Sequence, residues 1–221
     1  MRSWQEWLRG ALVRAGVPGL DEEAWERLER YLHWLSARGQ PMGLLGPRSV
    51  REMVEKDFLD SLMLLAYCDL RAGWRVVDVG AGAGLPGVPL KIARPETQLT
   101  VIEAAKRACA FLEAVARDLG LEMEVVWGRA EELGSRPPFY ERYDVAVTRA
   151  VADLPSVLRL CLPLVRKGGW LVVYKGPRVE EELPAAGEAV RALRGRIEQL
   201  ISFRLPSGYR RVLVVVSKAR G

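Results

Sequence analysis

The spacing of hydrophobic positions changes near residue 72. Before it, apolar side chains recur at helical spacing, so residues 2–15 predict one helix and a second is expected after Asp21, a typical N-cap residue. A third helix is predicted after Ser49, with Glu52 where it would complete a capping box. We therefore expect residues 1–72 to form an N-terminal helical cap without strands.

After residue 72, short apolar runs alternate with amphipathic segments. The predicted strands are 74–79, 98–103, 122–127, 143–150, 170–176, 197–206 and 210–218. The predicted helices start at 86 or span 106–120, 153–166 and 179–194. This alternation predicts an α/β fold with a mainly parallel, Rossmann-like sheet. The last two strands are joined too tightly for a crossover, so an antiparallel C-terminal strand is expected in a domain spanning 73–221.

The composition excludes several classes of protein. The chain has 221 residues, 49% of them hydrophobic, which is enough to bury a full core. No apolar run approaches the ~18 residues that span a bilayer, and the N-terminus lacks a signal-peptide pattern, so we expect a cytoplasmic protein with no membrane partner. Cys68, Cys109 and Cys161 lack CxxC spacing and predict reduced, buried thiols. With His33 as the one histidine, placed on a surface or interface, no metal site is expected.

Positive charge is concentrated in the last fifth of the chain. The formal net charge is +5, and residues 177–221 carry nine basic and five acidic side chains. Residues 1–72, in contrast, carry ten basic and eleven acidic side chains. A basic C-terminal region favours a polyanionic partner, although many arginines lie beside glutamates in the sequence.

A glycine-rich segment follows the first predicted strand. Asp78 lies at the end of that strand, one residue before its last, and Gly80, Gly82 and Gly84 follow. Glycines allow positive φ and a close approach of backbone to ligand, and the start of the next helix attracts an anion. Glu103 ends the second strand, where a carboxylate can accept both hydroxyls of a ribose. The pattern predicts a nucleoside cofactor with a charged tail.

Two cofactor classes compete for this loop. Residues 82–87 match the GxGxxG pattern of dinucleotide-binding proteins, which would indicate NAD. However, an aspartate at the strand end with the first glycine two residues later is typical of S-adenosylmethionine (SAM) enzymes, and the C-terminal hairpin also suits a SAM methyltransferase sheet. The register therefore favours SAM, and a glycine turn without a ligand is the remaining alternative.

The segment DVGAGAGLPGVPL, residues 78–90, resembles the SAM loop of the RsmG/GidB family, whose members methylate N7 of a guanine in 16S ribosomal RNA. The resemblance covers roughly residues 30–218. Its further motifs are LDSL at 59–62, RPE at 94–96, KR at 106–107 with FL at 111–112, RAEE at 129–132, TRAVA at 148–152 and KG at 175–176. It implies a SAM methyltransferase with ribosomal RNA or the small ribosomal subunit as partner, and we expect a monomer.

The resemblance also implies site residues. The cofactor-binding set is Asp78, Gly80, Gly82, Gly84, Leu85, Glu103, Ala104, Ala105, Ala130, Glu131 and Arg149. No catalytic residue is certain, and the candidates are Arg149 and Asp60. Contacts to RNA phosphates are expected from Lys175, Arg178, Arg204, Arg210 and Arg211, for which a solvated basic surface is the alternative. Guanine N7 has no proton to lose, so the chemistry requires no general base.

This sequence departs from the family pattern at two places. Gly43, Leu44 and Leu45 stand where the family usually has Asn-Leu-Thr, and Asp57 stands where it usually has histidine. Both places lie in the helical segment, near where substrate would enter. They leave open a methyltransferase that acts on another RNA site or a small molecule, and a non-catalytic module that binds SAM or RNA.

Overall fold

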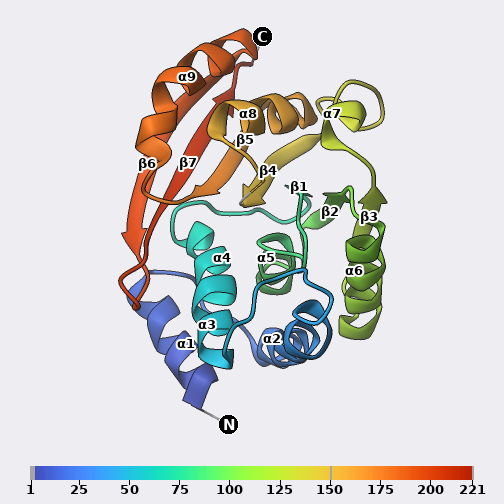
Figure 1. Cartoon of the computed structure of the whole chain (residues 1–221), viewed down its shortest axis with the longest axis vertical. Coiled ribbons are helices and arrows are strands. Elements are labelled where there is room, and N and C mark those ends of the chain that lie inside the picture. Colours follow the sequence, from blue (N-terminus) through green and yellow to red (C-terminus); the bar gives the residue numbers. More distant parts are fainter. Residues whose placement is uncertain (1–2, 150, 221) are drawn as a thin grey trace.

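A seven-stranded sheet runs through the middle of the molecule, with helices on both faces (Figure 1). The computed structural model describes residues 3–149 and 151–220. The strand order is β3-β2-β1-β4-β5-β7-β6. The strands are β1 (Arg75–Val79), β2 (Gln98–Glu103), β3 (Met123–Trp127), β4 (Tyr143–Arg149), β5 (Val165–Lys175), β6 (Gly195–Arg204) and β7 (Arg210–Lys218). Strands β1 to β5 pair in parallel, and β7 is antiparallel to both β5 and β6, which confirms the predicted sheet.

The N-terminal region is helical, as its sequence pattern predicts. It contains α1 (Ser3–Arg14), α2 (Glu22–Trp34), η1 (Leu35–Gly39), α3 (Val50–Met53), η2 (Val54–Leu59), α4 (Asp60–Leu62) and η3 (Met63–Ala66). Asp21 caps α2 by accepting a hydrogen bond from the Ala24 amide at 2.8 Å. Ser49 and Glu52 form the predicted capping box at the start of α3. These caps satisfy amide groups that the first helical turn leaves unpaired.

The remaining helices alternate with the strands. They are α5 (Gly87–Ala93), α6 (Lys106–Leu119), α7 (Ala130–Leu133), α8 (Leu154–Cys161), η4 (Leu162–Leu164) and α9 (Val179–Ala192). Helices α1 to α6 cover one face of the sheet, and α7, α8 and α9 cover the other (Figure 1). None of the described helices is long and apolar enough to cross a membrane.

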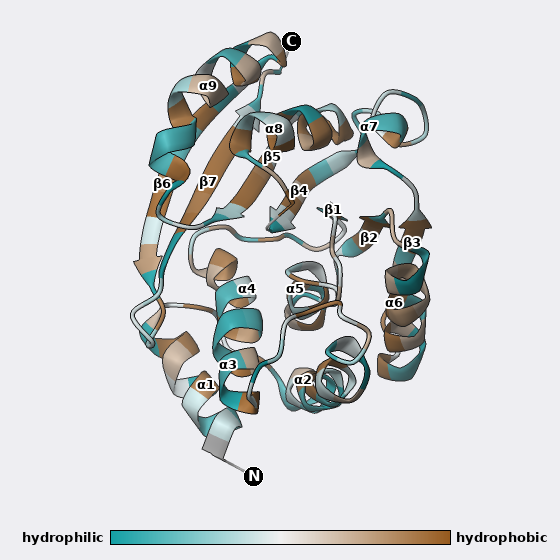
Figure 2. Cartoon of the chain, viewed as in Figure 1, coloured by the Kyte–Doolittle hydropathy of each residue, from teal (hydrophilic) through white to brown (hydrophobic). Residues whose placement is uncertain are grey.

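Each face of the sheet has its own apolar core. The first core joins Leu8 of α1 and Leu28 of α2 to Val76 of β1 and Val172 of β5, so it continues across residue 72. The second core lies under α7 to α9. Figure 2 shows the hydrophobic residues gathered along β5 and β7. The division into segments 1–72 and 73–221 marks a change of sequence pattern, and it stays a prediction as a domain boundary.

Some predicted boundaries are wrong. The helix expected over 153–166 ends at Cys161, because Pro163 cannot supply the amide hydrogen that a further turn requires. Strand β5 begins at Val165 instead of residue 170, so Gly168 and Gly169 lie within the strand. Its pairing with β4 shifts register between Tyr143 and Val145. The end of the strand expected over 143–150 falls on Ala150, which lies outside the described residues.

The cysteines and the histidine lie mostly as expected. Cys109 and Cys161 are buried, and Cys68 is only partly buried, so its predicted burial is wrong in degree. All three thiols are free. His33 is exposed near the end of α2.

Candidate cofactor and substrate site

The candidate site lies at the carboxyl ends of β1 and β4, two neighbouring strands in the middle of the sheet. The chain leaves β1 toward β2 on one side and β4 toward β5 on the other, which is where open α/β sheets bind ligands. A cavity of about 280 Å³ opens there. It is lined by Leu44, Leu45, Arg48, Gly80, Ala81, Gly82, Ala83, Leu85, Arg149 and Arg211. The cavity thus joins the glycine loop to residues from three distant parts of the chain.

The glycine loop between β1 and α5 requires its glycines. Gly80, Gly82 and Gly84 have φ of 68°, 56° and 100°, values that favour glycine. A Cβ on Gly84 would also lie 2.6 Å from Cγ2 of Val88, closer than packed atoms allow. Gly80 and Gly82 line the cavity, whereas Gly84 packs beneath it. The sequence therefore builds a tight backbone cradle that side chains would fill.

Two carboxylates hold this cradle. Asp78 accepts a hydrogen bond from the Gly87 amide at 2.7 Å, and its complete burial raises its pKa to about 7. Glu103 accepts from the amides of Gly82 and Ala105, both at 2.9 Å. A carboxylate offers about four lone-pair positions, so Glu103 can still accept from a ribose. Neither Asp78 nor Glu103 lines the cavity, but Glu103 is partly exposed whereas Asp78 is completely buried.

Helix α2 supports the loop from below. The Tyr31 hydroxyl donates to the Ala83 carbonyl at 2.6 Å, and the Tyr31 ring stacks on Phe58 at a centroid distance of 5.7 Å. Burial raises the pKa of Tyr31 well above its ordinary value, so the hydroxyl keeps its proton and remains a donor. The sequence pattern identifies Tyr31 only as an apolar face position of a helix, and nothing local in it indicates a contact with a loop 52 residues away.

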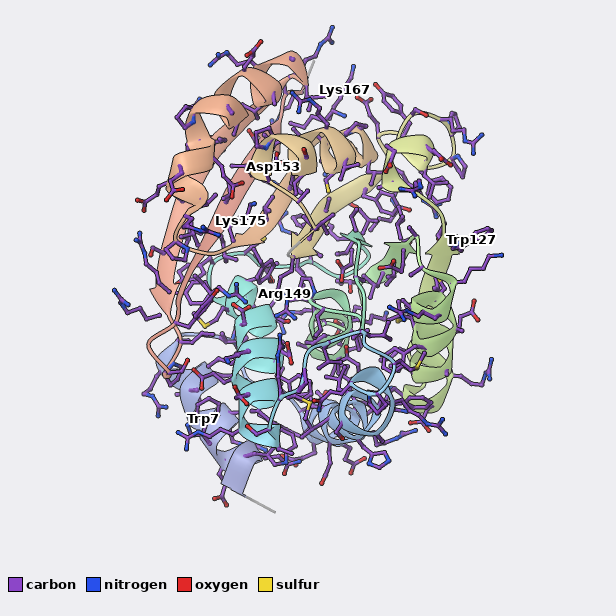
Figure 3. All side chains as sticks on the ribbon, viewed as in Figure 1. Trp7, Trp127, Arg149, Asp153, Lys167 and Lys175 are labelled. Atoms are coloured by element: carbon purple, nitrogen blue, oxygen red, sulfur yellow. The ribbon has the colours of Figure 1, made fainter. Side chains whose placement is uncertain are left out.

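A buried charge cluster forms the wall opposite the loop. The Arg149 guanidinium donates to the Lys56 carbonyl at 2.7 Å, to Asp60 at 3.2 Å and to Asp57 at 3.0 Å. Burial opposes the charge of Arg149, but the two carboxylates outweigh it and raise the arginine's pKa. Figure 3 shows Arg149 near the middle of the molecule, between the helical segment and the sheet. Arg149 is thus a fixed cation at the cavity wall.

Two further arginines complete this cluster. Arg48 pairs with Asp57, and Arg211 pairs with Asp60 at 2.9 Å. Both carboxylates are fully buried, and burial raises the pKa of Asp60 against the opposing effect of the arginines. The candidates Arg149 and Asp60 therefore lie in direct contact. Asp60 pairs with Arg149 and Arg211 and does not line the cavity itself.

The other predicted cofactor residues lie along the ends of β2 and β3. Ala104 and Ala105 follow Glu103, and the Ala104 carbonyl accepts a hydrogen bond from the Trp127 indole at 3.0 Å. Ala130 is buried at the start of α7, and Glu131 is exposed beside it. Figure 3 shows Trp127 on the side of the molecule formed by β3 and α6. These residues adjoin the glycine loop through Glu103 but do not line the cavity.

The predicted RNA contacts do not form one patch. Lys175 ends β5, where its amine donates to the Ala152 carbonyl at 2.8 Å and pairs with Glu182 at 2.7 Å. Arg178 is exposed directly before α9. The Lys175 charge is therefore largely engaged within the protein, whereas Arg178 is open to solvent.

The remaining predicted RNA contacts belong to the hairpin of β6 and β7. Arg204 is exposed and donates to the Gly208 carbonyl at 3.2 Å. Arg210 pairs with Glu180 at 2.7 Å. Arg211 points instead into the charge cluster and lines the cavity. Of these predicted residues, Arg211 alone lies in the candidate site.

The segment before α3 contributes to the site: sequence reasoning placed residues 43–45 near the substrate entrance but missed Arg48. Leu44 and Leu45 line the cavity, and a Cβ on Gly82 would lie 3.7 Å from the Leu44 carbonyl oxygen. Arg48 follows in the same segment and pairs with Asp57. The two departures from the family pattern were therefore the available signal, because both fall on the cavity or its wall.

Solved structures with low sequence identity share the fold. The cyclase SpnF is 18% identical with a TM-score of 0.60, covering 93% of this chain and 99% of that protein. TrmN from Thermus thermophilus is 20% identical with a TM-score of 0.57, covering 83% of this chain and 53% of that protein. Because one of them is a cyclase, these likenesses establish the architecture alone.

Sequence relatives are far more specific. A model of the family described as rRNA small subunit methyltransferase G (GidB) matches residues 24–210. A protein of that name from Pelotomaculum thermopropionicum is 40% identical, covering 90% of this chain and 84% of the relative. Another from Symbiobacterium thermophilum is 41% identical, covering 96% of this chain and 89% of the relative. The chain therefore belongs to the rRNA small subunit methyltransferase G family.

Proposed function

We propose that this protein is a SAM-dependent methyltransferase that methylates N7 of a guanine in small-subunit ribosomal RNA. The observation that carries the proposal is the cavity between β1 and β4, where a glycine cradle faces buried arginines. One half suits a nucleoside cofactor and the other a polyanion. Relatives at about 40% identity over most of their length carry the corresponding name.

The residues at the glycine loop fit SAM. Gly80, Ala81 and Gly82 line the cavity with little side-chain bulk, which leaves room for the methionine part, and Leu85 adds an apolar side chain. Glu103 stands at the end of β2 with acceptor capacity for the ribose hydroxyls. Ala130 and Glu131 begin α7 at the far end, where they would flank the adenine. SAM, when bound, supplies an electrophilic methyl group on a sulfonium.

The acceptor chemistry suits a site without a general base. Guanine N7 attacks with a free lone pair and has no proton to transfer, so rate enhancement comes from holding the reactants in line. Among the described residues, no histidine or cysteine lines the cavity. Arg149 is held by Asp57 and Asp60 in one orientation, which makes it a rigid part of the wall. The site thus offers positioning of the reactants.

We infer that the protein acts in the cytoplasm as a monomer on ribosomal RNA or the small ribosomal subunit. Exposed basic side chains at Arg178 and Arg204 are available for phosphate contacts. Lys175 and Arg210 would first exchange their glutamate partners for phosphate. The Arg210 pair is exposed and such pairs are worth little to stability, so its exchange costs little, whereas the Lys175 pair is largely buried and its exchange costs more.

Methyl transfer from labelled SAM to unmodified 16S ribosomal RNA and small subunits, with nucleoside mapping, tests the proposal. Arg149→Lys keeps the charge but loses the planar contacts to both aspartates, so we expect kcat/KM to fall about tenfold or more. Arg166→Lys is the matched control, because Arg166 pairs with Asp144 at 2.7 Å at the other end of β5. SAM binding without methyl incorporation into either RNA would refute the proposal.

A second candidate is methylation of a different acceptor. Leu45 lines the cavity at the place of the threonine in the family's usual Asn-Leu-Thr, so the wall facing the acceptor is more apolar here. Nucleoside mapping separates the two candidates, because a changed acceptor would place the label on another nucleotide or leave ribosomal RNA unlabelled.

A further inference from the structure

A second cavity adjoins the one at the glycine loop. It has a volume of about 240 Å³ and is lined by Arg48, Lys56, Tyr209 and Arg211. Arg48 and Arg211 line both cavities, so the two share a wall. The second cavity combines three cations with one aromatic ring. None of the sequence motifs discussed above accounts for Lys56 or Tyr209.

The fold joins two distant segments to build this cavity. The tip of the β6–β7 hairpin is fixed to η2, because the Ser207 amide donates to the buried Glu55 carboxylate at 2.6 Å. Within the tip, the Leu205 amide donates to the Tyr209 carbonyl at 2.9 Å. These bonds hold the tyrosine beside the helical segment that carries Lys56. The hairpin tip is therefore fixed to the helical segment by specific hydrogen bonds.

Cationic side chains line the second cavity, and the carboxylates that pair with its arginines lie behind them. Asp57 and Asp60 are completely buried behind Arg48 and Arg211, and neither carboxylate lines either cavity. Lys56 pairs with Glu52 at 3.0 Å, and both side chains are at least one-third exposed, so an incoming phosphate can compete for the amine. The surface presented to a ligand is therefore cationic, although carboxylates lie close behind it.

Tyr209 supplies the aromatic surface. It is 48% exposed, and the Arg211 guanidinium carbon lies 4.9 Å from its ring centroid. An exposed ring next to cations is the combination by which proteins hold unstacked bases, with stacking on the ring and charge on the phosphate. At about 240 Å³ the cavity lies below the 300–1,000 Å³ typical of drug-sized ligands, so it would hold part of one nucleotide and leave the rest exposed.

We propose that this second cavity receives the target nucleotide of the RNA, with its base on the Tyr209 ring and its phosphate against Arg48 and Lys56. The inference rests on the proposed function and adds the place of the acceptor. The deep, narrow major groove of A-form RNA hides guanine N7 from side chains, so the base has to leave the helix or come from a loop. A nucleotide held here lies against the wall of the donor cavity.

The test compares three variants in the methylation assay, with SAM affinity measured by calorimetry. Tyr209→Leu removes the ring and should lower kcat/KM for RNA by about 5- to 150-fold, the range for loss of one stacked base. Tyr209→Phe keeps the ring and should stay within about threefold of wild type. Tyr140→Leu is the control, because Tyr140 is 51% exposed with the Lys218 amine 5.5 Å from its ring, away from both cavities. It should retain wild-type activity.

The outcomes separate this inference from the proposed function. Undiminished kcat/KM for Tyr209→Leu, with an active wild type, overturns the inference alone. Equal losses in Tyr209→Phe and Tyr209→Leu overturn stacking, because the hydroxyl would then be the group in use. A loss of SAM affinity in Tyr209→Leu also overturns it, since the residue would then support the donor. A wild type that binds SAM but methylates no RNA refutes the proposed function, and this inference falls with it.

Discussion

Replacing Tyr31 by phenylalanine tests whether α2 shapes the cofactor loop. The substitution removes one hydroxyl and leaves the buried Ala83 carbonyl without that donor, while the stacked ring contact with Phe58 remains. A buried polar group left unpaired costs about 1–3 kcal/mol, so the free energy of unfolding should fall by that amount. Because the lost bond anchors the loop, SAM affinity should also fall by about 2- to 13-fold, the equivalent of one net hydrogen bond.

Tyr174→Phe provides the matched control. Tyr174 is also completely buried, and its hydroxyl donates to the Ser61 carbonyl at 2.7 Å, away from the glycine loop. Urea unfolding should show a similar loss of stability in both variants, whereas calorimetry should show weaker SAM binding only for Tyr31→Phe. If the two variants bind SAM equally well, support from α2 has no bearing on the loop and the reasoning is refuted.

Three further experiments test the loop and the charge cluster. The raised pKa of Asp78, about 7 against 3.8, means that the folded state binds more protons than the unfolded state between those values. Wild-type stability should therefore fall as the pH rises from 4 to 7, by up to about 4 kcal/mol relative to Asp78→Asn, and parallel pH profiles of the two unfolding free energies would contradict this. Gly84→Ala combines positive φ with atomic overlap and should lose about 2–5 kcal/mol, whereas Gly16→Ala, at positive φ in open space, should lose about 1 kcal/mol in the same thermal unfolding assay. A double-mutant cycle of Arg48→Met and Asp57→Asn should give a coupling energy of about 0.5–3 kcal/mol in urea unfolding, and additive losses would show that the pair is not coupled.

The elements were predictable where the information is local. Short apolar runs identified β1 and β2 almost to the residue, and the N-caps Asp21 and Ser49 set the starts of α2 and α3. The start of β5 was not predictable from the glycines, because pairing with Tyr143 extends the strand past the register shift. Local periodicity thus predicts which elements exist, and strand pairing decides where they begin.

The same distinction between local and long-range information applies to the site. Its donor half follows one continuous segment and the end of the next strand, so a motif can identify it. Its acceptor half depends on contacts across the chain, such as those of Arg149 with Asp57 and Asp60, 92 and 89 residues away. Arg211 and Tyr209 come from the last hairpin, and nothing in their local sequence indicates that they meet the helical segment. The sequence therefore predicts the cofactor more securely than the acceptor.

The departures from the family pattern lie in the acceptor half of the site. The charged side chains there remain paired with one another. Asp57 replaces the usual histidine, and Arg48 lies nine residues before it with its guanidinium on the new carboxylate. An aspartate at this fully buried position without cationic partners would be costly, whereas here it is shared by Arg48 and Arg149. The glycine loop and Glu103 keep their contacts with each other. The changes therefore alter the wall that the acceptor would meet and leave the glycine loop that would hold the donor intact.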